Sequence, residues 1–588
     1  MKHSLKNTAL SSLNGSHVQV EISRLGLRII FDGGVRLELS VPSDDLAWWA
    51  DAELAWMEAD DKSEMLHIAI RAPDCDGFRS YIFCPQTNTL LPIDWWVFGR
   101  PNFFTQAGKA LYLVGSDPFR PAGLLLIDGI GSSNSLIFHD DDKRYFYRLQ
   151  LSLEHGIILL VGKSTASFKV YCVLPQVETV SEIDLGLPDE PRSALVTLCE
   201  STAHIAVATQ SEICIYSCNL GSSPISTRLL WTDPNDEQYL YSLTSTQDHI
   251  LLISGRDADF RLRAIGSANG NCIETETPAY MNGCSLSFRN VVSDKNFAII
   301  QIENPMCSPV PGIWQYLLGI CQTDEEHKIA LQQHKFLSLE FNTSDNVSVG
   351  VSIWSPTVST LSTNERPCLV SCYGAYGRPP PLGFITWTTR LETTAYILVH
   401  IRGGGDRGMG WHKAGCGTRR RRSVDDFAEA LNWLQLVGQI NSDKTTFYAR
   451  SAGAVSVGSV LAENPHLATA AIFEYPLLDL VAAMSSGDAL SQAECDEWSI
   501  ETCCPTQLLT RQEYPPVFVL SGGSDWRTAS YQIQNWASKF ADMNVSSHSV
   551  TWRNNQGIGH GVHRNNPVQK EIDLEIEAFL RRVLSFPF

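Results

Sequence analysis

Three polar residues in the last third of the chain have the types and the order that nucleophilic catalysis requires. Ser451 lies in a small-x-Ser-x-Gly pattern, between a predicted strand at residues 445–449 and a predicted helix that begins at Ala452. Such a strand–turn–helix segment is a nucleophile elbow, which lifts the serine Oγ above the edge of a sheet. The Ala452 N–H at the helix start would point toward an oxyanion that develops during acyl transfer. The segment therefore predicts a serine nucleophile with one oxyanion donor.

An acid and a base follow Ser451 in the order that the triad of α/β-hydrolases demands. Asp525 comes soon after a predicted strand at 516–520, and sites form at the carboxyl ends of strands in such sheets. His560 lies between two glycines on a predicted loop, where its ring is free to reach the serine. We therefore expect Ser451, Asp525 and His560 to form a catalytic triad, with His563 as the rival base.

Strand-like and helix-like runs alternate in residues 337–588. This alternation predicts an α/β-hydrolase domain with a doubly wound, mostly parallel sheet. A helix predicted over 424–437 has an apolar residue at every third or fourth position, and Ser423 with Asp426 predicts its capping box. The four consecutive arginines at 419–422 are expected to be an exposed stretch before this cap.

Residues 46–336 have a different sequence pattern. Short runs of apolar residues, or of alternating apolar and polar residues, are separated by polar turns. A strong apolar run recurs at an interval of roughly 40–50 residues, which is typical of the blades of a β-propeller. At about 42 residues a blade, this all-β domain has room for seven blades. Residues 1–45 are expected to be an N-terminal segment that packs on the hydrolase or on the propeller.

The amino-acid composition limits the classes of partner that the protein is expected to bind and the cellular compartment in which it is expected to work. The 588 residues carry a formal net charge of −19, which argues against a nucleic-acid partner. There is no uninterrupted apolar run long enough to span a membrane, and no secretory signal follows the first lysines. The 16 cysteines form no C-x-x-C pair, so we expect no metal site and reduced thiols in a cytoplasmic protein. The sequence does not distinguish a monomer from a dimer.

Six motifs in the last 240 or so residues resemble the prolyl oligopeptidase family of serine peptidases (family S9), and in particular oligopeptidase B. The motifs are the elbow and the segments Tyr373–Gly377, Ile401–Gly408, Trp411–Gly415, Asp525–Arg527 and Gly559–Gly561. The resemblance implies that a seven-bladed propeller caps the hydrolase and restricts substrates to short peptides.

The resemblance also implies roles for single residues. Ser451 would be the nucleophile, His560 the general base and acid, and Asp525 the residue that orients His560. Arg527 would hold the substrate backbone near the scissile bond. The segment from Glu494 to Trp498 resembles one with which oligopeptidase B grips a basic side chain.

Within this segment, Glu494 and Asp496 stand at the paired acidic positions, and such a pair would favour Arg or Lys. The sequence departs from the family at Ser371, where a tyrosine is expected to be the second oxyanion donor. The chain is also shorter than the family norm at its N-terminus.

The leading hypothesis is an intracellular serine oligopeptidase that cleaves short peptides after Arg or Lys through an acyl-enzyme. This chemistry requires neither a metal nor an organic cofactor. Three alternatives stay open: a peptide-processing or cyclising acyltransferase with the same triad, a catalytically weakened propeller–hydrolase that acts as a binding protein, and a simple esterase. Ser371 motivates the second alternative, whereas an esterase has no need of so large a β domain.

Overall fold

The structure is a computed structural model of the whole chain. It describes all residues except 1–6, 14–15, 24–25, 32–35, 41–52, 61–64, 72–76, 88, 105–108, 119, 129–133, 153–156, 165–166, 175–177, 185–192, 210–211, 223, 235–237, 293–294, 358–363, 392, 486–493, 496, 526, 549, 557, 563–565 and 585–588. The chain forms two compact units. The first contains Met1–Ser164 and Phe168–Asp184, and the second contains Thr165–Ser167 and Leu185–Phe588.

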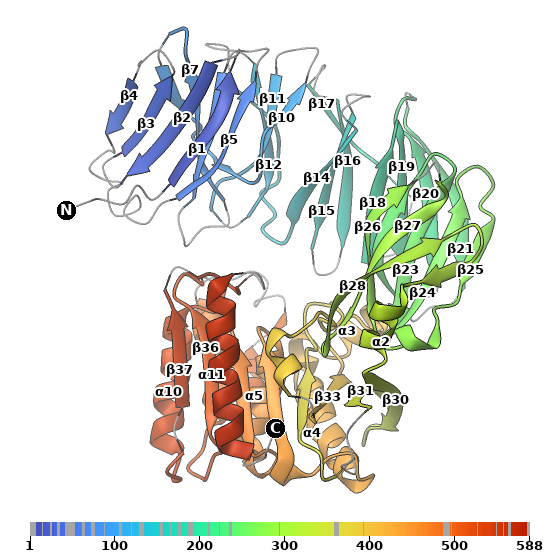
Figure 1. Cartoon of the computed structure of the whole chain (residues 1–588), viewed down its shortest axis with the longest axis vertical. Coiled ribbons are helices and arrows are strands. Elements are labelled where there is room, and N and C mark those ends of the chain that lie inside the picture. Colours follow the sequence, from blue (N-terminus) through green and yellow to red (C-terminus); the bar gives the residue numbers. More distant parts are fainter. Residues whose placement is uncertain are drawn as a thin grey trace. The chain divides into compact units, whose positions relative to one another are not determined.

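The first unit consists of four antiparallel sheets, drawn in blue to teal in Figure 1. Their strands are β1 (Asn7–Leu13), β2 (Ser16–Ser23), β3 (Gly26–Phe31) and β4 (Arg36–Ser40); β5 (Glu53–Asp60), β6 (Met65–Arg71), β7 (Arg79–Cys84) and β8 (Thr89–Pro92); β9 (Trp96–Val97), β10 (Asn102–Phe104), β11 (Lys109–Gly115), β12 (Gly123–Asp128) and β13 (Ser135–His139); and β14 (Phe146–Ser152), β15 (Ile157–Lys163), β16 (Phe168–Leu174) and β17 (Thr179–Glu182). Because β1–β4 already form such a sheet, the series begins at Asn7 rather than near residue 46.

The second unit begins with three more sheets of the same kind. Their strands are β18 (Ser193–Cys199), β19 (Thr202–Ala208), β20 (Ile213–Asn219) and β21 (Ser226–Asp233); β22 (Tyr239–Ser245), β23 (His249–Arg256), β24 (Asp259–Gly266) and β25 (Cys272–Thr275); and β26 (Ser285–Val292), β27 (Phe297–Asn304), β28 (Cys307–Gln315) and β29 (Ile320–Gln322). Within the described ranges the chain thus has seven antiparallel sheets, as expected for a seven-bladed propeller. The prediction of an all-β propeller is confirmed.

The apolar runs that suggested blades have a common place in these sheets. The runs at 111–114, 157–161, 205–208, 250–253 and 297–302 lie in β11, β15, β19, β23 and β27. In each sheet this strand lies between two others. The side chains of β11, β15, β19 and β23 are largely buried, whereas buried and half-buried side chains alternate along β27. Burial of side chains on both faces of the first four strands explains their continuous apolar runs.

An eight-stranded sheet completes the second unit. Its order is β30-β31-β33-β32-β34-β35-β36-β37, and its strands are β30 (His334–Asn342), β31 (Ser348–Pro356), β32 (Cys368–Cys372), β33 (Ala395–His400), β34 (Thr445–Arg450), β35 (Ala470–Glu474), β36 (Val517–Gly522) and β37 (Val550–Asn555). Strands β30 and β31 are antiparallel to their neighbours, and the other six run parallel. The predicted α/β-hydrolase fold is therefore confirmed.

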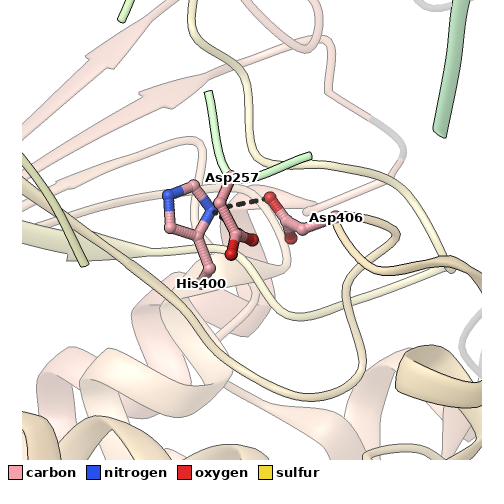
Figure 2. A group of neighbouring side chains, drawn as sticks. All are labelled: Asp257, His400 and Asp406. Carbon is pink, nitrogen blue, oxygen red and sulfur yellow. Dashed lines mark hydrogen bonds and ion pairs between the residues drawn. The ribbon is translucent and has the colours of Figure 1, made fainter. Parts of the chain in front are cut away.

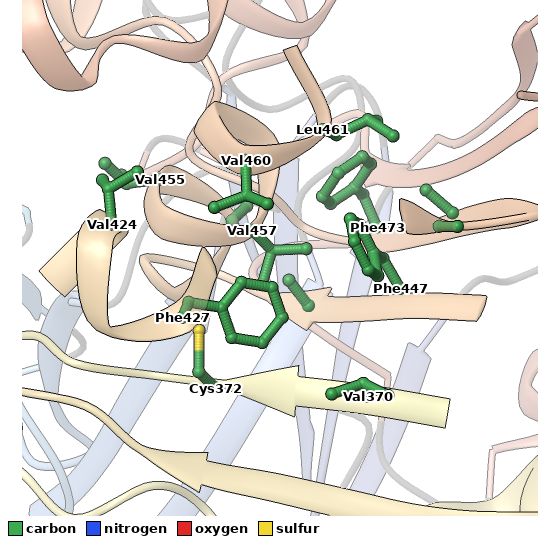
Figure 3. Close-up of a cluster of buried hydrophobic side chains, with 14 of the residues drawn as sticks. Val370, Cys372, Val424, Phe427, Phe447, Val455, Val457, Val460, Leu461 and Phe473 are labelled. Carbon is green, nitrogen blue, oxygen red and sulfur yellow. The ribbon is translucent and has the colours of Figure 1, made fainter. Parts of the chain in front are cut away.

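Helices cover both faces of this sheet. The described helices of the second unit are α2 (Glu325–Leu331), which contacts β28 of a blade, and α3 (Gly408–Lys413), α4 (Arg421–Leu436), α5 (Gly453–Glu463), α6 (Leu480–Ser485), α8 (Glu497–Cys503), α9 (Pro505–Leu508), α10 (Ser530–Met543) and α11 (Pro567–Leu584). Helices α4, α5 and α10 share one apolar cluster with one face of the sheet, and Figure 3 shows α5 packed above β32 and β34 in this cluster. Helix α11 packs on the other face. No described helix is long and apolar enough to span a membrane.

The start of α4 corrects two sequence predictions. The helix begins at Arg421, so Ser423 lies inside its first turn and does not cap it. The Ser423 hydroxyl lies instead within hydrogen-bonding distance of the carbonyls of Arg402 and Gly415. The arginine run is not uniformly exposed, because Arg420 is completely buried and donates to the carbonyl of Gly374.

Candidate active site

The elbow forms between β34 and α5 as the pattern predicts. Ser451 has a φ of +54°, the left-handed conformation of a sharp turn. Its N–H donates to the carbonyl of Glu474 on the neighbouring strand β35 over 3.0 Å. A side chain at Gly453 would come within 2.6 Å of the carbonyl oxygen of Cys372, so only glycine fits at this position. The close approach holds the start of α5 against the end of β32.

The structure brings the three predicted catalytic side chains together. His560 Nε2 lies 2.9 Å from Ser451 Oγ, and His560 Nδ1 lies 2.7 Å from Asp525 Oδ2. Asp525 follows β36, His560 follows β37 and Ser451 follows β34, so all three stand at the carboxyl edge of the parallel strands. In this arrangement the imidazole can take the hydroxyl proton while the carboxylate holds the ring in place.

Asp525 is fixed by more than the histidine. It is buried, and its Oδ1 accepts from the backbone N–H groups of Arg527 and Thr528. Thr528 Oγ1 lies 2.7 Å from Asp525 Oδ2 and 3.0 Å from the carbonyl of Tyr475. Burial opposes ionisation, but the hydrogen bonds with His560 and Thr528 outweigh it and hold the pKa of Asp525 below its usual value. The acid therefore stays charged when the histidine gains a proton.

The Ala452 backbone is placed to donate to an oxyanion. Ala452 directly precedes α5, and among the described residues its N–H makes no hydrogen bond. An unpaired N–H at the start of a helix attracts negative charge, because the helix dipole adds to the donor. This geometry supports the role that the sequence assigns to Ala452.

Ser371, the predicted second donor, has a different environment. It lies within β32, where its side chain shares a face with Leu369 and forms a hydrogen bond with Tyr396. Tyr373 follows β32 directly, and its Cα lies 3.4 Å from the place that a side chain at Gly453 would take. Tyr373 is therefore a second candidate for this donor, beside Ser371, to which the count along the sequence pointed.

The electrostatic neighbours of Tyr373 also suit a donor. Burial raises the pKa of Tyr373 and outweighs the lowering effects of Arg378, Arg420 and Arg527. The hydroxyl therefore keeps its proton at neutral pH. Among these cations, Arg527 follows the catalytic Asp525 by two residues, which indicates that Tyr373 and the triad share one edge of the sheet.

Two substitutions that each remove only a hydroxyl group test whether Tyr373 or Ser371 is the second oxyanion donor. We expect Tyr373→Phe to lower kcat by about 10²–10³-fold, the usual cost of one oxyanion donor, with little change in KM. Ser371→Ala should leave kcat nearly unchanged. Steady-state kinetics on one peptide substrate measures both, and a large loss in Ser371→Ala alone would restore the sequence-based assignment.

The predicted substrate-binding residues are only partly described. Arg527 is exposed, with its backbone N–H bound to Asp525. Glu494 is buried, and its Oε1 lies 2.7 Å from His412 Nε2. Asp496 lies outside the described residues, as do the side chain of Trp498 and all of the rival base His563.

Glu494 lies in a cluster of charged groups that sequence reasoning missed. Arg420 Nη1 is 3.9 Å from Glu494 Oε2. Burial disfavours the charged form of His412, but its hydrogen bonds with Cys416 and Glu494 outweigh this and raise its pKa to about 9. At neutral pH the carboxylate of Glu494 therefore faces two cations. Its Oε2 accepts no hydrogen bond within the described part of the chain.

One group of described residues has the composition of a metal site. Atoms of Asp257, His400 and Asp406 that could bind a metal lie within 4.8 Å of one another. Both ring nitrogens of His400, however, are within hydrogen-bonding distance of protein oxygens. Arg407 binds Asp257 and would repel a cation. Hydrogen bonds thus occupy both ring nitrogens of His400, whereas Asp257 Oδ1 accepts none from the described residues.

The fold and the triad define a class of protein, an α/β-hydrolase joined to a β-propeller. Residues 386–586 match the model of the Prolyl oligopeptidase family. This part of the chain is therefore a domain of that family, and the resemblance predicted from the sequence motifs is confirmed for it.

Similar proteins include several peptidases. The chain is 26% identical over 337 residues to a Rattus norvegicus protein named Prolyl endopeptidase-like, an alignment that covers 55% of this chain and 45% of the relative. It is 21% identical over 456 residues to Protease 2 of Moraxella lacunata, with 73% and 64% covered. Oligopeptidase B from Trypanosoma brucei, with covalently bound antipain in a closed form, superposes with a TM-score of 0.74 at 14% identity, covering 100% of this chain and 88% of that one. The chain thus matches less than half the length of the rat relative.

Proposed function

We propose that the protein is a serine oligopeptidase that hydrolyses short peptides through an acyl-enzyme. The observation that carries this proposal is the continuous hydrogen-bond chain from Ser451 Oγ through His560 to Asp525. The unpaired Ala452 N–H beside the nucleophile adds a site for the oxyanion. A serine, a base, an orienting acid and an oxyanion donor are the parts that acyl transfer requires.

In this proposal each group has its own task. Ser451 Oγ attacks the peptide carbonyl carbon while His560 Nε2 takes its proton, and Asp525 stabilises the imidazolium that forms. The carbonyl oxygen becomes an oxyanion, held by the Ala452 N–H and, in our assignment, by the Tyr373 hydroxyl. His560 then protonates the leaving amine, and an acyl-enzyme remains on Ser451. Water deprotonated by His560 attacks this ester, and the proton returns to Ser451 Oγ as the carboxylic acid leaves.

We further propose that the residue before the scissile bond is Arg or Lys. The buried Oε2 of Glu494 accepts no hydrogen bond from the described residues, so it is the atom to which a guanidinium would donate. His412 and Arg420 reduce the negative charge of this carboxylate. Recognition of a basic side chain therefore depends on Asp496 as a second anion.

A library of short peptides, with products identified by mass spectrometry, tests both activity and preference. Wild type should cleave after Arg or Lys. Glu494→Gln should lower kcat/KM by about 10–100-fold for these peptides, which equals about 1.4–2.7 kcal/mol, and much less for neutral ones. Glu501→Gln, at an exposed position of α8, is the matched control. An equal loss of kcat/KM on basic and neutral peptides would show that Glu494 does not recognise the charge of the substrate side chain.

The same product masses distinguish hydrolysis from peptide cyclisation. Hydrolysis adds one water to each cleaved bond, whereas transfer of the acyl group to the peptide's own amine adds none. We expect the hydrolytic product.

We also propose that the protein works in a reducing compartment such as the cytoplasm. The fifteen described cysteines, which are all free thiols, support this proposal.

A further inference from the structure

A buried ionic cluster joins a propeller blade to the hydrolase sheet within the second unit. His400, at the end of β33, is 1% exposed. Its Nδ1 lies 2.7 Å from Asp406 Oδ1 and 3.9 Å from Asp257 Oδ1. Asp257 comes from the turn between β23 and β24, so Nδ1 faces one carboxylate of the hydrolase and one of the blade. Figure 2 shows the three side chains facing one another.

Arg407 binds both the β23–β24 turn of the blade and strand β30 of the hydrolase sheet. It forms an ion pair with Asp257, and its Nη2 lies 2.8 Å from Glu340 Oε1 on β30. A side chain at Gly350 of β31 would come within 2.7 Å of Asp257 Oδ2 and 3.0 Å of Arg407 Nη2. The strand thus leaves room for this ion pair.

The surroundings of His400 accommodate a proton on both ring nitrogens. Ser352 Oγ lies 3.3 Å from the carbonyl oxygen of Asp257 and 2.8 Å from His400 Nε2, so the hydroxyl can donate to this carbonyl while its oxygen accepts from Nε2. The other nitrogen, Nδ1, donates to the Asp406 carboxylate. Only an imidazolium donates from both nitrogens.

The charges around His400 also favour a protonated ring. The fixed charges that face or adjoin the ring are the anions Asp257, Asp406 and Glu340 and the cations Arg256 and Arg407. Tyr241 is also near both aspartates, and burial raises its pKa, so it stays neutral. A charged His400 brings three cations to three anions, and a neutral one leaves an uncompensated buried negative charge, which is costly.

The cluster is connected to the active site through one loop. His400 leads into residues 401–408, which include Asp406 and Arg407. The carbonyl of Gly403 accepts from the N–H of Gly377 over 3.3 Å. A side chain at Gly374 would come within 2.5 Å of Ile401. The loop therefore packs directly on the segment that follows Tyr373.

We propose that the His400 imidazolium is a positioning residue, which fastens the β23–β24 turn to the loop at 401–408 and so holds the Tyr373 segment at the active site. Loss of its proton removes one of the two ring donors and leaves the cluster with a net negative charge. The consequence for turnover rests on the proposed peptidase function, whereas the consequence for the cluster does not.

The sign of the pH dependence follows from the surroundings of the ring. Burial lowers the pKa of His400, but Asp406 and Asp257 outweigh this effect and raise the pKa above its ordinary value, with Arg407 opposing. A group with a raised folded-state pKa stabilises the fold fully below its unfolded value of about 6.5. That stabilisation is lost as the pH rises through the folded-state pKa. The cluster should therefore loosen in alkaline solution.

Hydrogen exchange read by mass spectrometry on the full chain tests this. After correction for intrinsic exchange, wild-type segments 254–259 and 401–408 should exchange at least about tenfold faster once His400 loses its proton, as expected for the loss of one hydrogen bond made by a charged group. In His400→Gln both segments should already exchange fast at pH 6 and show no further rise. The control His466→Gln, at an exposed histidine, should behave as wild type.

Wild-type exchange that does not change with pH, or an unaltered pH dependence in His400→Gln, would overturn the proposal. If His400→Gln does not fold, Asp257→Asn replaces it. Removing this carboxylate should move the wild-type transition to lower pH, and an unmoved transition would count against the cluster. Stoichiometric zinc binding that is abolished in His400→Gln would also overturn the proposal.

Steady-state kinetics gives a second measurement. In wild type, kcat should fall in alkaline solution while KM stays the same, and this fall should not occur in His400→Gln. A chain without peptidase activity would leave the exchange test intact.

Discussion

Ser451→Ala is expected to lower kcat by about 10⁵–10⁶-fold, while the protein keeps its fold. Loss of the nucleophile removes the covalent pathway, and the fall is as large as that caused by loss of a whole triad. Alanine is smaller than serine, so it fits at the tip of the elbow without a clash. Steady-state turnover and covalent labelling by a fluorophosphonate probe give two independent measurements. Wild type should be labelled, and Ser451→Ala should not.

A second serine near the site provides the control. Ser524 lies next to Asp525 and is partly exposed, so Ser524→Ala should be labelled and should turn over peptide as wild type does. Labelling that survives in Ser451→Ala would assign the nucleophile to another residue. If wild type is well folded but neither labelled nor active, the result would favour the alternative of a binding protein that has kept the hydrolase fold.

The second largest effect is expected at the acid. Asp525→Asn should lower kcat by about 10⁴-fold, because an amide at this position favours the wrong tautomer of the catalytic histidine. The backbone N–H groups of Arg527 and Thr528 can still donate to the amide oxygen, so the loop should keep its conformation. The rate of acyl-enzyme formation, measured by stopped flow, reports this loss directly.

Asp542→Asn is a matched control for removal of one carboxylate. Asp542 is exposed on α10, so its substitution should leave turnover unchanged. A loss in Asp525→Asn that is no larger than tenfold would mean that another group orients His560. In that case the chain from Ser451 to Asp525 would not be the catalytic arrangement.

The order of functional elements in the hydrolase could be predicted from the sequence because it depends on local patterns. A strand, a small-x-Ser-x-Gly turn and a helix are consecutive in the chain, and the strand predicted at 445–449 is β34 with one residue more. Asp525 and His560 each follow a predicted strand. In a parallel sheet all such positions come to one edge, so proximity could be inferred without knowledge of the side-chain contacts.

Residues whose roles depend on distant partners could not be found in this way. Arg420 belongs to an arginine run that reads as a solvated stretch, but α4 begins one residue later and turns this one side chain inward. Counting back from a motif pointed to Ser371, because a linear count does not show that Ser371 lies inside β32 whereas Tyr373 follows the strand, beside the start of α5. The link between Asp257 and His400 joins residues far apart in the chain, and neither has a local pattern.

The positive φ of Ser451 has a consequence for laboratory evolution. A residue with a side chain in this left-handed conformation costs of the order of 1–3 kcal/mol, and glycine would relieve that cost at the expense of the hydroxyl. Selection for heat resistance alone would therefore reward inactive chains at this codon. A useful thermostabilising campaign must screen for turnover in every round, because a strained residue of the site is also the one that performs the attack.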